Sequence, residues 1–171
     1  MREQGMFDPA RLVFIDETAA ARWRSCAAAA RAASASSTAC GKGTVRPSPS
    51  QWLRAPCTVD GAMNGAKFLA YVKQCLAPTL SRKDIVVIDN LPAHKAPGVR
   101  DAIEARGATL RYLPQYSPDL NPIEMPFSKL KASLRKAAER TIPRLRRRIG
   151  RFACTLTARE ARNYFRHAGY E

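Results

Sequence analysis

Two short apolar runs that each end in an aspartate constrain the fold of this 171-residue chain most strongly. Leu12 to Ile15 is followed by Asp16, and Ile85 to Ile88 is followed by Asp89. Runs of this length, bounded by polar residues, are typical of buried parallel strands. Because the carboxyl ends of parallel strands meet at one edge of an open sheet, where ligands bind, the sequence predicts an α/β fold with both aspartates at that edge.

A third acid, Glu124, opens an amphipathic helix. Asn121 is the expected N-cap, with a proline at the first helical position and Glu124 at the third. An apolar stripe follows at helical spacing and is expected to pack on the sheet: Ile123, Phe127, Leu130, Leu134 and Ala138. Pro126 in the second turn predicts a local kink.

Three carboxylates at one edge would repel one another unless a cation lay among them. Hard cations such as Mg²⁺ or Mn²⁺ prefer carboxylate oxygen, so the sequence predicts a metal site. Taken singly, Asp16 is also explained as a strand-end turn residue and Glu124 as a capping acid. The neighbouring acids Asp60 and Asp119 are assigned to turns, since one precedes a glycine and the other follows a proline.

The remaining elements follow from caps and periodicity. Helices are expected over 65–76, with Asn64 as N-cap, and over 97–106, with Gly107 just past the end. A strand is expected from Thr109 to Leu113, and a capping box at Thr157 predicts a short last helix ending at Gly169.

The formal net charge of +15, from 29 Lys and Arg against 14 Asp and Glu, favours a polyanionic partner. Nucleic acid is the preferred interpretation, with binding that weakens as salt is added; a solvated basic surface or a ribosome-like role is the alternative. The basic segment 144–151 is interpreted as either a solvated face or a nucleic-acid contact.

No apolar stretch reaches the ~20 residues that a membrane-spanning helix needs, and the N-terminus has no signal-peptide pattern, so a cytoplasmic location without membrane contact is expected. The five cysteines are odd in number and contain no Cys-x-x-Cys. This argues for free thiols rather than disulfides or a zinc site.

Three segments, LVFIDET, DIVVIDNLPAHK and YLPQYSPDLNPIE, resemble the catalytic domain of DDE transposases of the mariner superfamily, in its bacterial insertion-sequence branch. The resemblance includes the 34 residues between Asp89 and Glu124 and covers 11–18 and about 58 to the C-terminus. It implies a ribonuclease H-like mixed sheet flanked by helices. The first and fourth strands of this fold lie side by side and bring Asp16 next to Asp89.

The resemblance also implies an activity. Asp16, Asp89 and Glu124 would be the catalytic residues and would bind two Mg²⁺ or Mn²⁺ ions ~3.5–4 Å apart, with one ion activating the attacking oxygen and the other stabilising the leaving oxygen. Water would free a 3′ hydroxyl at a transposon end, and that hydroxyl would attack target DNA, in a homo-oligomer when active. Candidates for supporting roles or DNA contacts are Asn90, His94, Lys129, Lys131 and Arg135.

Two departures from the family pattern are visible. No helix-turn-helix precedes Arg11, so residues 1–10 are taken as a short lead-in and 11–171 as the catalytic domain, with a separately encoded N-terminal half or a truncated gene as explanations. Residues 19–57 are atypical: no Asp or Glu occurs between Glu17 and Asp60, and Ala, Arg, Ser, Pro and Gly dominate. We interpret 19–51 as a compensated frameshift, or alternatively an Ala-rich insertion.

From this composition we expect no strand between Ala19 and Gln51 that pairs with Leu12 to Ile15, and hence degraded second and third strands, with the segment cut early by proteases. The leading function is a DDE transposase catalytic domain, inactive or truncated in this copy if the sheet is incomplete. The alternatives are a nuclease of the same fold and a non-catalytic, basic DNA-binding remnant.

Overall fold

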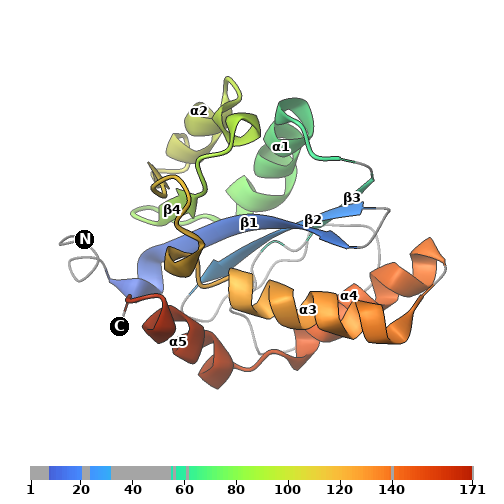
Figure 1. Ribbon diagram of the computed structural model, residues 1–171. Helices are drawn as coiled ribbons and strands as arrows, with labels where there is room; N and C mark the ends of the chain where they lie inside the picture. Colours follow the sequence, from blue (N-terminus) through green and yellow to red (C-terminus); the bar gives the residue numbers. More distant parts are fainter. Residues whose placement is uncertain are drawn as a thin grey trace.

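The computed structural model describes residues 8–20, 24–31, 55, 57–60, 62–139 and 141–170, which form a five-stranded sheet with helices on both faces (Figure 1). The strands are β1 (Leu12–Ala20), β2 (Arg24–Arg31), β3 (Cys57–Asp60), β4 (Ile85–Ile88) and β5 (Thr109–Tyr112). The α-helices are α1 (Gly65–Tyr71), α2 (Val99–Glu104), α3 (Glu124–Ala137), α4 (Ile142–Thr155) and α5 (Ala158–His167). Short helical turns cover Pro9–Arg11, Val72–Leu76, Ala77–Thr79, Pro92–Lys95 and Pro118–Leu120.

The strand order is β3-β2-β1-β4-β5. β1 pairs in parallel with β4, from Leu12 opposite Ile85 to Ile15 opposite Ile88, and β4 pairs in parallel with β5. The first and fourth strands therefore lie side by side, as the resemblance implied. Because the parallel pairing stops at Ile15 and Ile88, Asp16 and Asp89 follow it directly on two adjacent strands.

The expectation that no strand between Ala19 and Gln51 would pair with β1 is wrong. β2 pairs antiparallel with β1, from Val13 opposite Arg31 to Ala20 opposite Arg24, and β3 pairs antiparallel with β2. A sheet ladder is built from backbone groups that every residue except proline supplies, so tertiary pairing overrides the weak strand propensity of alanine. The second and third strands are present, and β1 has a partner on each side.

Residues 32–54, which include Pro47 and Pro49, lie outside the described residues. Early proteolysis in that stretch stays a prediction. The out-of-frame origin of 19–51 also stays a hypothesis, which the nucleotide sequence of the locus would test.

Alternation along β1 divides the core into two layers. Val13 and Ile15 pack with Val86, Ile88 and Leu110 against the helices between β3 and β5, where Phe68, Val72, Leu76 and Ile103 are buried. Leu12 and Phe14 face the other side and pack with Val87, Leu113, Phe165, Ala168 and Tyr170. Asp16 shares the second face by this alternation, and Glu17 shares the first.

The apolar stripe of α3 packs against the two helices that follow it, and α3 also contacts the sheet at β1, as the sequence predicted. Ile123, Phe127, Leu130 and Leu134 are buried with Leu145, Ile149, Leu156 and Ala161 of the α4–α5 region. Ala138 is exposed and does not join the stripe, because it ends the helix in a left-handed conformation (φ 46°). Pro126 lies in the first turn, where its missing N–H would have no intrahelical partner.

Sequence signals placed several helix ends correctly. Asn64 accepts a hydrogen bond from the Lys67 backbone N–H at 2.9 Å. The helix predicted over 97–106 is shorter, since α2 runs from Val99 to Glu104, and Gly107 (φ 73°) ends the turn that follows it. Thr157 and Glu160 form the capping box of α5. The first helix is shorter than expected, since regular α-helix ends at Tyr71 and a π-helical turn continues to Leu76. No helix within the described ranges is long and apolar enough to cross a membrane.

Phe165 packs α5 against the sheet, and we expect its replacement by alanine to destabilise the protein strongly. It is fully buried and meets Phe14 edge-to-face at a centroid distance of 5.5 Å. Phe165→Ala should cost about 3–5 kcal/mol of unfolding free energy, which corresponds to a melting temperature lower by roughly 10 °C for a chain of this size. Thermal unfolding followed by circular dichroism measures this. Tyr116→Ala, at a 99% exposed position, is the control and should change stability little.

Candidate active site

A pocket of about 490 Å³ lies where β1, β4 and α3 meet, and all three predicted acids line it. Asp16 comes from β1, Asp89 from the end of β4 and Glu124 from the first residue of α3. The other lining residues are Asn90, Leu91, Pro92, Lys95, Leu113, Pro114, Gln115, Tyr116, Ser117, Pro118 and Asn121. The turn-rich segment between β5 and α3 therefore forms one wall of the pocket.

Asp16 lies within β1 rather than at its end, because β1 continues to Ala20 in its pairing with β2. Its carboxylate is buried and held by two donors. The Asn121 side-chain amide donates to Oδ2 at 3.0 Å, and the Glu17 backbone N–H donates to Oδ1 at 2.6 Å. These contacts fix the direction in which the Asp16 carboxylate points.

Burial raises the pKa of Asp16 to about 8, and the negative charge of Glu124 is the next cause. A hydrogen bond between the Asp16 and Glu124 side chains and the charge of Asp89 raise this pKa further, while the Glu17 N–H opposes the shift. Glu124 and Asp89 thus both act on the Asp16 carboxyl group. Without a cation, their mutual repulsion favours a proton on Asp16 at neutral pH.

Asp89 is held by His94, which lies in the turn that follows β4. Nδ1 of His94 contacts Oδ1 of Asp89, and Nε2 of the same ring hydrogen-bonds Oε1 of Glu17 at 2.8 Å. The ring is fully buried and packs against Phe68 at a centroid distance of 4.2 Å. His94 therefore connects the end of β4 to β1 behind the pocket.

Burial lowers the pKa of His94, but hydrogen bonds to Asp89 and Glu17 outweigh burial and bring it to about 9. The imidazole is consequently charged at neutral pH and lies between two carboxylates. This cation offsets part of the negative charge at the pocket and orients Asp89.

The oxygen-bearing side chains that line the pocket are of the kind that bind a hard divalent cation, although their atoms do not converge on one point. Within the part of the chain that the structure describes, no three His, Cys, Asp or Glu side chains are arranged to hold a metal ion. Asp89 is engaged by His94 and Asp16 by Asn121, which accounts for this. The Asn90 side-chain oxygen, beside Asp89, is buried without a hydrogen-bond partner in the described structure. An orphaned oxygen and three acids that repel one another are the donor set such a cation prefers.

The mouth of the pocket carries exposed apolar and cationic side chains. Leu91 and Tyr116 are the exposed large hydrophobic residues of the described structure, with Tyr116 in a left-handed conformation (φ 57°). Lys95 lies 5.7 Å from the centre of the Tyr112 ring. An aromatic face and an ammonium group beside the three acids are suited to a ligand with both rings and phosphates.

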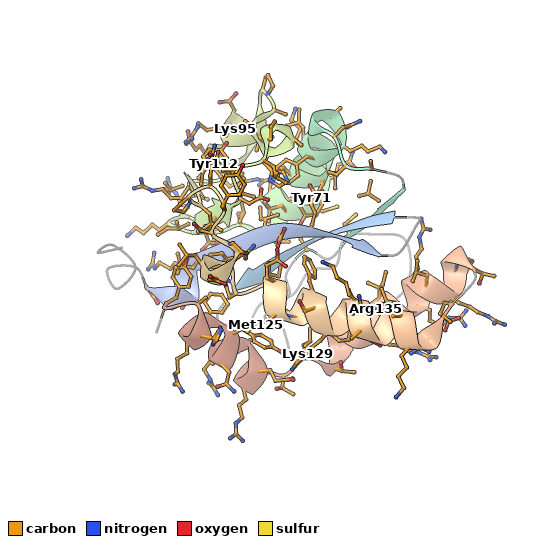
Figure 2. All side chains as sticks on the ribbon, in the orientation of Figure 1. Tyr71, Lys95, Tyr112, Met125, Lys129 and Arg135 are labelled. Carbon is orange, nitrogen blue, oxygen red and sulfur yellow. The ribbon has the colours of Figure 1, made fainter. Side chains whose placement is uncertain are left out.

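The supporting residues predicted on α3 lie away from this pocket. Figure 2 shows Lys129 and Arg135 along α3, whereas Lys95 and Tyr112 lie across the sheet on the side of α2. Nζ of Lys129 forms an ion pair with Oε1 of Glu160 in α5 at 3.1 Å and lies 5.2 Å from the centre of the Tyr164 ring. Lys131 is half-buried and Arg135 is exposed. Of the five candidates, Asn90 lines the pocket and His94 lies behind it.

Sequence reasoning missed the roles of Asn121 and Glu17. Asn121 was expected as an N-cap, and its side-chain oxygen does accept a hydrogen bond from the Ile123 backbone N–H at 3.3 Å, although regular α3 begins only at Glu124. The Asn121 amide nitrogen has a second role, because it donates to Asp16. Glu17 looked like part of a strand end. Because it is the next residue after Asp16 in β1, its side chain lies on the opposite face of the sheet. His94 contacts it there, although the two residues are far apart in the sequence.

The solved structures with a similar, ribonuclease H-like fold include the catalytic domain of a mariner transposase. The catalytic domain of Mos1 mariner transposase superimposes with a TM-score of 0.67 at 16% identity, covering 98% of this chain and 79% of that chain. The Mos1 catalytic domain with raltegravir and manganese gives 0.69 at 18% identity, covering 98% and 80%. The Mos1 mariner paired-end complex with manganese gives 0.64 at 17%, covering 94% of this chain and 52% of that chain.

At the sequence level, residues 48–146 match the family of DDE superfamily endonucleases. This match spans more than half of the chain, and the protein belongs to that family. Asp89 and Glu124 lie inside the matched segment and Asp16 lies before it. No curated protein sequence matches the chain.

Proposed function

We propose that residues 11–171 form the catalytic domain of a DDE transposase of the mariner superfamily, in its bacterial insertion-sequence branch, which cleaves DNA and joins the freed end to target DNA. The observation that carries the proposal is that Asp16, Asp89 and Glu124 line one pocket. Support also comes from the family membership and from the +15 net charge, which suits a polyanionic substrate. The exposed Tyr116 ring and Lys95 at the mouth fit a base and a phosphate of such a substrate.

In this proposal, Asp16, Asp89 and Glu124 would hold two Mg²⁺ or Mn²⁺ ions, which would activate the attacking oxygen and stabilise the leaving oxygen. Asn121 orients Asp16 through the 3.0 Å hydrogen bond to Oδ2. Asp16 must release the proton that its raised pKa retains before it can bind a cation. His94 orients Asp89 from behind and is itself held by Glu17.

The expected partners are transposon ends and target DNA, with a homo-oligomer as the active form. A nuclease of the same fold is the second candidate, because the matching family is described as endonucleases. The two functions differ in one step only. A nuclease would cut DNA with water, whereas a transposase would also use a 3′ hydroxyl as the attacking group.

A strand-transfer assay separates these functions. We expect the full chain, given a duplex with a pre-cleaved 3′ end and plasmid target DNA, to produce joined products with Mg²⁺ or Mn²⁺ and none with EDTA. Cutting without joining would favour the nuclease. Binding without either reaction, in both metals, would leave only a non-catalytic DNA-binding protein and would contradict the proposal.

A further inference from the structure

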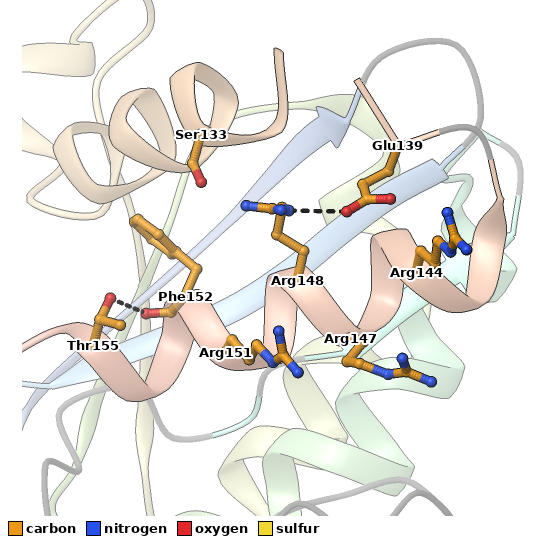
Figure 3. Close-up of a pocket in the computed structure, with 8 residues that line it drawn as sticks. All are labelled: Ser133, Glu139, Arg144, Arg147, Arg148, Arg151, Phe152 and Thr155. Atoms are coloured by element: carbon orange, nitrogen blue, oxygen red, sulfur yellow. Dashed lines mark hydrogen bonds and ion pairs between the residues drawn. The ribbon is translucent and has the colours of Figure 1, made fainter. Parts of the chain in front are cut away.

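A second hollow, separate from the carboxylate pocket, is lined by four arginines of α4 (Figure 3). Its volume is about 460 Å³. Its lining residues are Ser133, Glu139, Arg144, Arg147, Arg148, Arg151, Phe152 and Thr155. It shares no lining residue with the carboxylate pocket. The side-chain chemistry of this hollow is cationic rather than acidic.

The spacing of the arginines explains why they gather. Positions 144, 147, 148 and 151 follow the i, i+3, i+4, i+7 pattern that places side chains on one face of a helix. Leu145 and Ile149 occupy the other face and are buried against α3. The apolar contacts with α3 therefore hold the arginine face in a fixed direction, with Ser133 and Glu139 at its border.

The local charge is strongly positive. One acid lines the hollow, Glu139, and it pairs with Arg148 at 3.3 Å. Arg144, Arg147 and Arg151 are exposed, and α4 contains no Asp or Glu. The positive charges of the other three guanidinium groups are thus not balanced by an acid that lines the hollow. Guanidinium is planar, stays charged and binds phosphate oxygens through paired N–H donors.

The dimensions suit a nucleic-acid backbone. Arg144 and Arg151 are seven positions apart, which is about 10 Å along a helix axis. One strand of duplex DNA advances ~3.4 Å per phosphate, so this row can follow about three successive phosphates. α3 links the two sites, because it begins with Glu124 in the carboxylate pocket and carries Ser133 at the hollow.

We propose that the arginine face of α4 docks the phosphate backbone of duplex DNA outside the segment that enters the carboxylate pocket. This proposal rests on the proposed function insofar as DNA is the substrate. It adds a docking surface that positions the duplex without reading its sequence, since guanidinium–phosphate contacts carry no base information. Binding at α4 needs no metal, because the arginines supply the positive charge themselves. The acids of the carboxylate pocket, by contrast, repel the phosphate backbone unless cations are present.

The test compares two triple variants with the same loss of charge. Arg144→Gln, Arg147→Gln and Arg151→Gln remove the exposed arginines of the hollow, and the matched control carries Arg106→Gln, Arg159→Gln and Arg162→Gln, which are exposed elsewhere. Fluorescence anisotropy with a duplex of about 30 base pairs of arbitrary sequence, in EDTA at several salt concentrations, gives Kd and its salt slope. Circular dichroism verifies that both variants are folded.

We expect the hollow variant to weaken binding on the order of 10²-fold and to lower the salt slope by about 2–3, with a control effect of only a few-fold. Glu139→Gln should tighten DNA binding, because it releases Arg148 from its ion pair. A variant that had lost its fold would bind DNA more weakly, not more tightly. The proposal would be overturned if the two triple variants had equal effects on Kd or if Glu139→Gln weakened DNA binding. Tighter binding of an RNA duplex than of a DNA duplex would also overturn it. Strand transfer by the wild type in the same preparation would show that the proposed function stands independently.

Discussion

Asp89→Asn should abolish metal-dependent DNA cleavage while leaving the protein folded. Asparagine keeps the shape of the side chain, and its oxygen can still accept a hydrogen bond from His94 behind the pocket. It removes one of the negative charges that would bind the cations. Metal ions supply several kcal/mol of transition-state stabilisation, so we expect a rate lower by roughly 10³-fold or more, equivalent to about 4 kcal/mol.

The matched control is Asp119→Asn. Asp119 lies in the turn before α3, is exposed and does not line the carboxylate pocket. Cleavage of labelled duplex DNA in Mg²⁺ or Mn²⁺ should be nearly unchanged in this variant. Full activity of Asp89→Asn would remove Asp89 from the proposed site, and equal loss in both variants would show that the effect is not local to the pocket.

The stability of the metal-free protein should fall as pH rises from about 6.5 to 9. Asp16 has a pKa raised to about 8 when folded. Between its ordinary value of 3.8 and about 8, the folded state holds a proton that the unfolded state has lost, so unfolding becomes easier as pH rises. His94 has a pKa raised from 6.5 to about 9. Its stabilising charge is fully present below 6.5 and is lost as pH rises through 9.

Thermal unfolding in EDTA between pH 6.5 and 8.5 measures this fall. We expect a loss on the order of 2 kcal/mol, or about 5 °C in melting temperature. Mg²⁺ or Mn²⁺ should reduce the fall, because ionised Asp16 then has a cation beside it, and metal affinity should increase over the same pH range as the proton is released.

Asp16→Asn provides the control for the pH dependence. Its neutral amide removes the cost of burying an ionised carboxylate, so in EDTA at pH 8 this variant should be more stable than the wild type and should no longer gain stability from added metal. A melting temperature that rises with pH in the wild type, or an Asp16→Asn variant that gains as much from metal as the wild type, would contradict the interpretation.

The second and third strands mark where sequence reasoning failed. The alanine-rich segment 24–31 has neither alternation nor strong strand propensity, and it nevertheless forms β2 between β1 and β3. Backbone hydrogen bonds to β1 and β3 hold this strand, and side-chain patterns indicate such pairing only weakly. The family match begins at residue 48 and therefore includes β3 but neither β1 nor β2.

By itself, the sequence determined the apolar strand segments that lead to Asp16 and Asp89 and the helix that carries Glu124, because hydrophobic runs are local signals. These are the three acids that line the pocket. Only the tertiary structure decided how those acids are held. Asn121 reaches Asp16 across 105 positions of sequence, and His94 reaches Glu17 across 77. No local pattern encodes such contacts, because they depend on which strands lie side by side and on the face to which each residue is turned.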